Sequence, residues 1–317
     1  MSRRPHRARA RSLCLLLTLA FLLLPAIRLC AADDGGEAES WTKLIIGGRD
    51  AALGGAAGAL VGDPFAVQFN PALSLGLQSW HASTQTFLLP DGRNLEYAGL
   101  SGLAGGPTGM GWDIDYAQLN SPALELRVAN TPQPAGTFGS GASLTRLGFA
   151  VWVLDQSLAV GLDLKFFSQA LQADSAWGYS EDLGALYRPL GWLDLGCVLE
   201  NPFSNVSWTT GLGENLPLEG RLSAVAYALT RRLDLGADCE FSAAQGPQVH
   251  LGLEGWPIAG ILALRAGLDN GQWALGMGAA TTVLGVRVSL DYALASDASA
   301  AADQFQNRIS LDVGFTL

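Results

Sequence analysis

From about residue 74 to the end of the chain, hydrophobic and polar residues alternate one by one in short segments. The clearest segments are Leu158–Phe166, Leu193–Glu200, Leu233–Phe241 and Arg308–Leu317. In the first of them, apolar side chains occupy every second position, and glycine, aspartate and lysine lie between them. Alternation with a period of two is the pattern of a β-strand that has one apolar and one polar face.

Fourteen such segments can be counted, and bacterial outer-membrane barrels have an even number of strands. The predicted strands are 75–89, 95–105, 108–120, 139–153, 157–172, 180–188, 193–201, 219–228, 233–242, 248–255, 261–269, 272–280, 285–295 and 307–317. Short turns alternate with longer connections, of which the longest are 121–137, 173–179, 202–218 and 296–306. Short turns at one end and longer loops at the other are typical of outer-membrane barrels. We therefore predict an all-β fold, a closed antiparallel transmembrane β-barrel of about 14 strands over residues 74–317.

A soluble β-sandwich would also alternate, and it is the main alternative. Aromatic residues favour the membrane barrel because they fall near both ends of the segments, where barrels carry interfacial girdles. The aromatic residues beside the short turns are Trp152, Tyr187, Trp192 and Trp256, and those near the other ends are Tyr116, Trp177, Tyr179, Trp208, Trp273 and Tyr292.

The polar face of the segments carries many charged residues at regular inward positions, which is typical of a polar lumen. The candidate lumen-lining residues are Asp113, Asp115, Asp163, Lys165, Asp194, Asp238, Glu254, Arg265, Arg287 and Asp291. Asp113 and Asp115 share one face of a strand and could also be interpreted as a catalytic pair, but the regular charge ladder favours a lumen-lining role.

The first 32 residues have the pattern of a secretory signal peptide. Five arginines within the first 11 residues precede an apolar run from Leu13 to Leu24, and the small residues Ala31 and Ala32 follow. The run is shorter than the roughly 20 residues that a spanning helix needs, and no later segment reaches that length. Cleavage after Ala32 would remove six arginines and leave 13 basic against 29 acidic residues, a net charge of −16. Such a chain has no basic surface for nucleic acid.

Residues 33–73 form the predicted N-terminal segment and luminal plug. The stretch Gly47–Leu73 is rich in glycine and alanine, which allow close backbone packing, and its only charges are Arg49, Asp50 and Asp63. Asn70 followed by Pro71 predicts the start of a helix, with asparagine as the cap. A surface loop with one helical turn is the alternative. Inside a barrel, Arg49 would need an acidic partner, and the candidates are Asp63, Asp163, Asp194, Asp238 and Glu254.

No enzyme motif, metal site or cofactor site is predicted. His81 and His250 have no metal-ligand spacing with each other or with Cys197 and Cys239. No serine lies in the Gly-x-Ser-x-Gly frame of a nucleophile elbow, and no lysine follows the glycines as in a phosphate-binding loop. Cys197 and Cys239 lie on alternate strands with segment 219–228 between them, so we expect free thiols about 10 Å apart, facing lipid.

The plug stretch carries a family likeness in the order of its short motifs. These are Gly48-Arg49, Gly54-Gly55-Ala56, Asp63-Pro64 and Asn70-Pro71-Ala72-Leu73, directly after the signal peptide. In this order they resemble the amino-terminal segment of FadL-type outer-membrane transporters, and more closely that of the PorV/PorQ group within that superfamily. The resemblance makes Arg49, Asp63, Asn70, Pro71 and Ala72 the plug and family-motif residues.

The resemblance implies a 14-strand barrel in the bacterial outer membrane with its amino-terminal plug in the lumen. It leaves two functions open. The FadL likeness implies passive passage of small hydrophobic molecules across that membrane. The PorV/PorQ likeness implies a structural or shuttle component of a type IX protein secretion system, whose partners would be secretion-system proteins. In both cases the surrounding partner is outer-membrane lipid.

Overall fold

The computed structural model describes residues 39–89, 92–106, 108–128, 130, 132–242, 246–297 and 304–315. The predicted signal peptide, residues 1–32, lies outside the described residues. Among the described residues, four short helices precede the first strand: η2 (Ser40–Lys43), α2 (Gly48–Ala52), η3 (Ala66–Gln68) and η4 (Pro71–Gly76). Among the described residues, no helix is long and apolar enough to cross a membrane.

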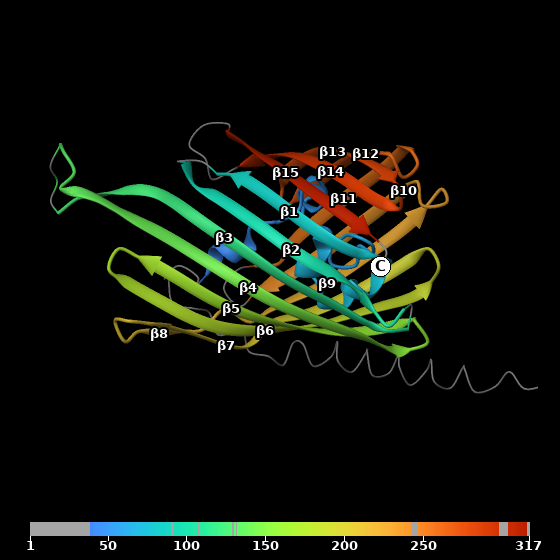
Figure 1. Ribbon diagram of the computed structural model, residues 1–317, viewed down its shortest axis with the longest axis horizontal. Coiled ribbons are helices and arrows are strands. Elements are labelled where there is room, and N and C mark those ends of the chain that lie inside the picture. The colour runs from blue at the N-terminus through green and yellow to red at the C-terminus, as the bar shows by residue number, and fades with distance from the viewer. Residues whose placement is uncertain are drawn as a thin grey trace, which may run out of the picture. The chain divides into compact units, whose positions relative to one another are not determined.

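Every later element is a β-strand (Figure 1). The strands are β1 (Trp80–Leu88), β2 (Asn94–Ala104), β3 (Met110–Leu126), β4 (Gly136–Leu154), β5 (Leu158–Leu171), β6 (Asp174–Leu190), β7 (Leu193–Trp208), β8 (Gly213–Glu214), β9 (Glu219–Ala228), β10 (Leu233–Ser242), β11 (Gln248–Ile258), β12 (Leu262–Asp269), β13 (Gln272–Val283), β14 (Val286–Asp297) and β15 (Gln304–Phe315).

The strands form a closed antiparallel barrel. Neighbours in sequence pair with each other, β7 pairs with β9, and β1 pairs with β15 from Trp80↔Phe315 to Leu88↔Asn307. The two-residue β8 pairs only with β7 and adds no member to the ring, which therefore has 14 strands. The predicted fold class is confirmed.

Several strand boundaries differ from the predictions. The first strand begins at Trp80 and not at residue 75, because the capped helix η4 occupies Pro71–Gly76. At the long-loop end, β3, β6 and β7 extend into the predicted loops 121–137, 173–179 and 202–218. The hydrogen bonds between neighbouring strands are made by backbone groups and do not require apolar side chains. A strand can therefore continue beyond the segment in which apolar and polar residues alternate. The β3–β4 hairpin is the most extended, and it projects to the left in Figure 1.

The outward face of the barrel is apolar. Exposed side chains recur at alternate positions, for example Leu264 and Leu268 in β12 and Leu290 in β14. A continuous apolar surface on a closed barrel matches the hydrocarbon interior of a bilayer, whereas charged residues occupy the inward positions. The chain is a transmembrane barrel.

Three of the predicted girdle aromatics point inward instead. Trp152 packs on the apolar cluster inside the lumen, Trp208 packs on a second interior cluster, and the Trp256 Nε1 donates to Glu254 Oε1 at 2.8 Å. Trp256 lies two residues from the inward-facing Glu254, so the period-two rule assigns both to one face. Trp177 and Trp192 do face outward, with 64% and 54% of their surfaces exposed.

Cys197 and Cys239 are free, as predicted. Cys197 in β7 and Cys239 in β10 both lie opposite Leu222 of the intervening β9. Two strand spacings, about 10 Å, therefore separate them, which is beyond the reach of a disulfide.

Candidate functional site: a plugged lumen

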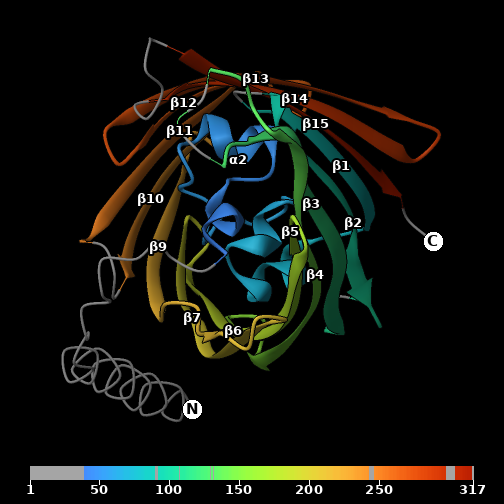
Figure 2. The ribbon, with the colours of Figure 1, turned by 90° about the vertical axis from the view of Figure 1, so that its left-hand side faces the viewer.

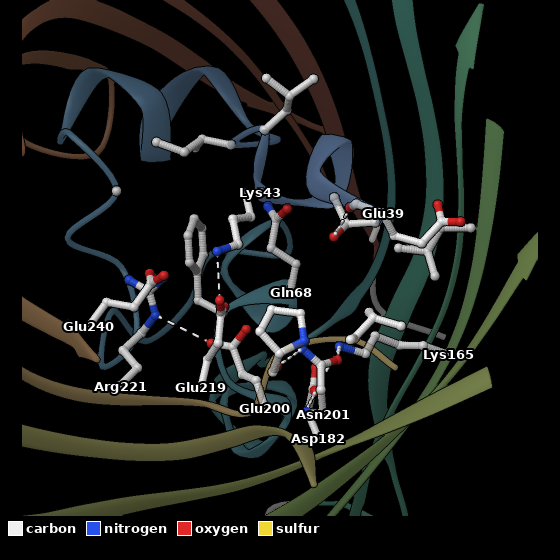
Figure 3. A pocket seen from close by; sticks show the side chains of 18 of the residues that line it. Glu39, Lys43, Gln68, Lys165, Asp182, Glu200, Asn201, Glu219, Arg221 and Glu240 are labelled. Carbon is white, nitrogen blue, oxygen red and sulfur yellow. Dashed lines mark hydrogen bonds and ion pairs between the residues drawn. The ribbon is translucent and has the colours of Figure 1, made fainter. Parts of the chain in front are cut away.

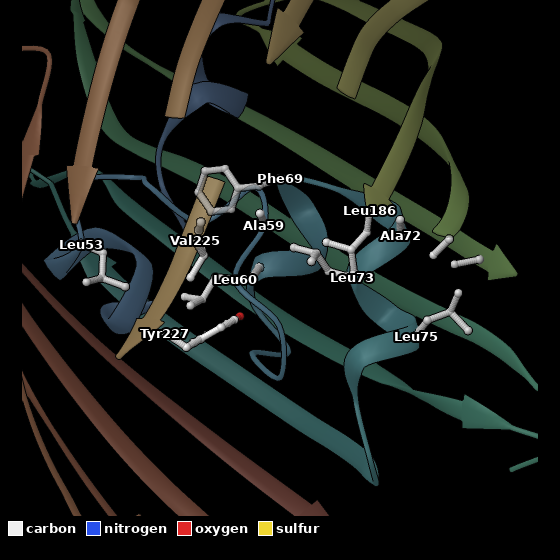
Figure 4. Packing of buried hydrophobic residues seen from close by; sticks show 14 residues of the cluster. Leu53, Ala59, Leu60, Phe69, Ala72, Leu73, Leu75, Leu186, Val225 and Tyr227 are labelled. Atoms are coloured by element: carbon white, nitrogen blue, oxygen red, sulfur yellow. The ribbon is translucent and has the colours of Figure 1, made fainter. Parts of the chain in front are cut away.

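Residues 39–79, here called the plug, fill the barrel from inside. Figure 2 looks along the barrel and shows the blue and cyan plug segments, with α2 labelled, inside the ring of strands. The apolar core of the barrel lies at this contact: Leu60 and Leu73 of the plug pack with Leu186, Val225 and Tyr227 of the wall (Figure 4). The predicted plug ended at residue 73, whereas η4 continues to Gly76 and the first strand begins at Trp80.

Eight glycines of the wall, here called the wall glycines, allow the plug to lie directly on the strands. At each of them a Cβ atom would lie between 2.2 and 2.9 Å from a plug atom, closer than non-bonded atoms approach. The wall glycines are Gly111 (β3), Gly161 (β5), Gly184 (β6), Gly196 (β7), Gly236 (β10), Gly252 (β11), Gly267 (β12) and Gly276 (β13). They leave no layer of side chains between plug and wall around much of the barrel.

The motif Asn70-Pro71-Ala72 anchors the second half of the plug. The Asn70 side chain caps η4 by accepting from the Ala72 backbone N at 3.1 Å, and Pro71 occupies the first turn, as predicted. The Asn70 Nδ2 also donates to Gly58 O of the plug at 2.9 Å and to Ala185 O of β6 at 3.0 Å. All three motif residues are buried. One side chain therefore fixes the helix start, the plug fold and the wall contact together.

Arg49 joins the first half of the plug to the wall. Its guanidinium makes a two-pronged contact with Glu254 of β11, at 2.8 Å from Nε and 2.6 Å from Nη2, and reaches Asp63 of the plug at 3.2 Å. Arg265 of β12 also binds Glu254 at 2.6 Å, and its Nη1 lies 2.6 Å from Asp291. Glu254 is one of the carboxylates that were predicted from the sequence as partners of Arg49. It is completely buried, and its ion pairs with two guanidiniums compensate the energetic cost of removing its charge from water.

Asp50 lies beside this network and differs from its neighbours. Its side chain is completely buried, and neither carboxylate oxygen has a hydrogen-bond partner in the described part of the chain. Burial raises the pKa of Asp50 well above its usual range, and the nearby Asp63 raises it further, whereas Arg49 and Arg265 act in the opposite direction. Burial in the docked plug therefore favours the neutral form of this carboxyl group.

The remaining predicted lumen residues face the interior in two further groups. Arg146 of β4 lies between Asp115, at 3.4 Å, and Asp163, at 3.8 Å, while Asp113 is buried beside them without a hydrogen-bond partner among the described residues. Lys165 reaches Asp182 at 2.7 Å.

The other group contacts the plug or the short-turn end. Asp238 accepts from the Gly58 backbone N at 2.9 Å, and Asp194 accepts from the Tyr227 hydroxyl at 3.0 Å. Arg287 is half-buried and donates to Gly260 O at 3.2 Å. Of the ten predicted lumen residues, eight are buried and two, Arg287 and Asp291, are half-buried.

Two cavities lie on opposite sides of the plug and share no lining residue. The upper cavity, towards the long loops, measures about 160 Å³ and is lined by charged side chains, among them Lys43, Arg221 and Glu240 (Figure 3). In it the Lys43 Nζ binds Glu219 at 2.6 Å, and Arg221 binds Glu240. The lower cavity, towards the short turns, measures about 400 Å³.

Sequence reasoning missed the wall glycines and Asp50 as site features. The glycines alternate with apolar residues, so the sequence predicts that they face the lumen. Only the structure shows that the backbone of the plug lies against them. Asp50 was seen as one of three plug charges, yet nothing in the sequence separated it from the paired Asp63. Among the described residues, no group of histidine, cysteine and carboxylate side chains is placed to hold a metal ion.

No protein-family model and no curated protein matches the sequence. Among solved structures, the fold is similar to the toluene transporter TbuX of Ralstonia pickettii, with a TM-score of 0.58, 13% identity, and 85% of this chain and 98% of that chain covered. The monoaromatic hydrocarbon channel CymD gives a TM-score of 0.56 and 12% identity over 86% and 98% of the two chains. A Pseudomonas aeruginosa FadL homologue gives 0.53 and 11% over 84% and 97%. The chain thus has a fold of the FadL type.

Proposed function

We propose that this protein is a plugged barrel of the bacterial outer membrane that passes small hydrophobic molecules without an energy source or a catalytic step. The observation that carries the proposal is the plug, which closes a 14-strand lumen and is tied to the wall by separable polar contacts at Arg49 and Asn70. The structures with a similar fold include a toluene transporter and a monoaromatic hydrocarbon channel, which supports this class of cargo.

Passage requires the plug to move, because the two cavities lie on opposite sides of it. A covalent lock tests this step. A Cβ built on Gly236 lies 3.3 Å from the Ala56 Cβ, close to the roughly 3.5–4.5 Å separation found in disulfides. The lock is the double variant Ala56→Cys with Gly236→Cys in a background that carries Cys197→Ser and Cys239→Ser.

The measurement is the initial uptake of radiolabelled toluene and of a labelled long-chain fatty acid by cells that express the protein in their outer membrane. We expect uptake to fall to the level of cells without the protein when the lock is oxidised, and to return on reduction. The two single-cysteine variants are the controls and should respond to neither treatment, and Gly236→Cys alone also shows the effect of placing a Cβ 2.7 Å from the Ala56 carbonyl oxygen. Mass spectrometry shows whether the disulfide has formed. If uptake is unchanged although the disulfide is present, passage does not depend on movement of the plug.

A second candidate function is the PorV/PorQ-like role in protein secretion. It is favoured by the charged lining of the upper cavity, because pockets for hydrophobic ligands are mostly apolar. Under this hypothesis the barrel binds secretion-system proteins and carries no small molecule. Crosslinking in the native membrane followed by mass spectrometry distinguishes the two, since recovery of secretion components together with an absence of protein-dependent uptake supports the second.

A further inference from the structure

Three side chains at the seam between β1 and β15 form a chain of hydrogen bonds that the passage of molecules does not require. The Ser79 Oγ lies 3.0 Å from the His81 Nε2. The His81 Nδ1 lies 3.0 Å from Asp312 Oδ2 and 3.1 Å from Asp312 Oδ1. A hydroxyl on one ring nitrogen and a carboxylate on the other is the order of groups in a serine-hydrolase triad, which is recognised by geometry and not by sequence position.

The fold places this cluster on a cavity. Ser79, His81 and Asp312 all line the lower cavity, and Ser79 is half-buried while the other two are buried. The ring of His81 fits because its cross-strand partner is Gly314, where a Cβ would lie 3.0 Å from the His81 Cε1 and 3.3 Å from the Ser79 Oγ. The nucleophile, the base and the open space needed for a substrate therefore meet at one place.

A positive charge lies in the same row of the sheet. Gly314 pairs with His81 on one side and with Arg287 of β14 on the other, and Arg287 lines the same cavity. Two strand spacings, about 10 Å, separate the backbones of His81 and Arg287. The arginine side chain turns towards the β11–β12 turn, where its Nη1 donates to Gly260 O at 3.2 Å, so it contributes positive charge to the cavity from the side of β14 away from Ser79.

We propose that Ser79, His81 and Asp312 hydrolyse small carboxylic esters in the lower cavity. Ser79 Oγ attacks the ester carbonyl and forms a C–O bond while its proton passes to His81 Nε2. The tetrahedral intermediate collapses, the ester C–O bond breaks, and His81 returns the proton to the leaving alcohol. Water then attacks the acyl-serine with the same base, which releases the carboxylic acid and restores Ser79.

Ser79 and His81 are the catalytic residues, and Asp312 is a positioning residue that holds the imidazole with Nε2 towards the serine. This activity departs from the expectation, drawn from the sequence, that the chain has no enzymatic role. That expectation relied on the absence of a Gly-x-Ser-x-Gly frame, and Asp312 lies 231 positions from His81. The proposed hydrolysis is independent of the proposed passage of hydrophobic molecules, because its tests involve neither the disulfide between plug and wall nor the uptake of a cargo.

The first test is covalent labelling of the full-length processed protein in detergent with a fluorophosphonate probe. We expect the probe to modify the peptide that contains Ser79 and to lose its target in Ser79→Ala. Ser289→Ala is the matched control, because Ser289 lines the same cavity, and it should label as the wild type does. Chymotrypsin in the same detergent is the positive control for the probe. If chymotrypsin is labelled and Ser79 is not, the proposal is overturned.

The second test measures hydrolysis of p-nitrophenyl butyrate. We expect kcat to fall by about 100-fold or more in Ser79→Ala and His81→Gln, in line with the loss of general-base catalysis. In Asp312→Asn we expect a lower kcat with an unchanged KM, which separates a positioning role from a collapsed cavity. The heat-modifiable migration of the barrel on gels checks that each variant is folded. Equal rates in wild type and folded His81→Gln would overturn the proposal.

Discussion

Arg49 is the residue on which the docking of the first half of the plug depends. Its two-pronged contact with Glu254 is replaced by nothing in Arg49→Ala, although Arg265 still compensates the carboxylate. Because Arg265 still pairs with Glu254, we expect the loss to cost less than the roughly 3–5 kcal/mol of a buried charge left without any partner. We expect a barrel that still assembles and shows brief conductance bursts in planar bilayers, where the wild type is silent. Arg49→Lys keeps the positive charge but cannot make the two-pronged contact, so we expect it to give fewer bursts than Arg49→Ala. An Arg49→Ala variant that shows no conductance bursts would contradict the role of Arg49 in docking the plug.

Asp50 gives the plug a dependence on pH. Its pKa is raised in the docked plug by burial, and an undocked carboxyl has a pKa of about 3.9. The docked state is therefore favoured fully below about pH 4, and the stabilisation is lost as pH rises through the raised pKa. The charged groups that face Asp50 are Arg49, Asp63, Arg265 and Asp291. We expect the burst frequency of Arg49→Lys to increase between pH 4 and pH 8, and the additional change Asp50→Asn to abolish that increase. An unchanged slope would assign the titration to another group.

At the scale of the element, the strands are shaped by what lies inside them. A methyl group at Gly196 would lie 2.4 Å from the Gly58 carbonyl oxygen of the plug, whereas one at Gly220 meets its nearest atom at an ordinary 3.9 Å. Overpacking of this kind costs about 1–3 kcal/mol. We expect Gly196→Ala to lower the temperature at which the barrel loses its heat-modifiable migration on gels, and Gly220→Ala to leave it unchanged. Equal effects would mean that the plug does not press on β7.

The alternation of residues sufficed to predict the elements but not their ends or their partners. Strands such as β5 and β10 carry a full apolar face because lipid covers it, so their positions could be read directly. The outer ends of β6 and β7 pair through their backbones, as Ala176 does with Trp208, so these strands continue beyond the segments that the sequence predicted. The contacts of Arg49 with Glu254, and of His81 with Asp312, depend on which strands meet across the lumen. That information appears only when the ring is closed.

At the scale of the whole molecule, the plug decides whether the barrel is a pore. A barrel of 14 strands without filling side chains would hold water, and the described cavities are separated by the plug. We expect deletion of residues 40–76 to give a barrel that assembles and conducts ions steadily in planar bilayers, while the intact chain does not. Large, steady pores in the intact protein would contradict the plug and identify an ordinary porin.

The position of the plug in the chain fixes an order of events during assembly. The plug directly precedes β1, and β1 closes the ring against β15, the last of the described strands. The Gly48 backbone N donates to the Ser310 side chain of β15, so the plug contacts the strand that closes the seam. We expect the seam to shut on a plug that is already in place. If so, the machinery that inserts this protein into the membrane keeps β1 and β15 apart until the plug lies between them.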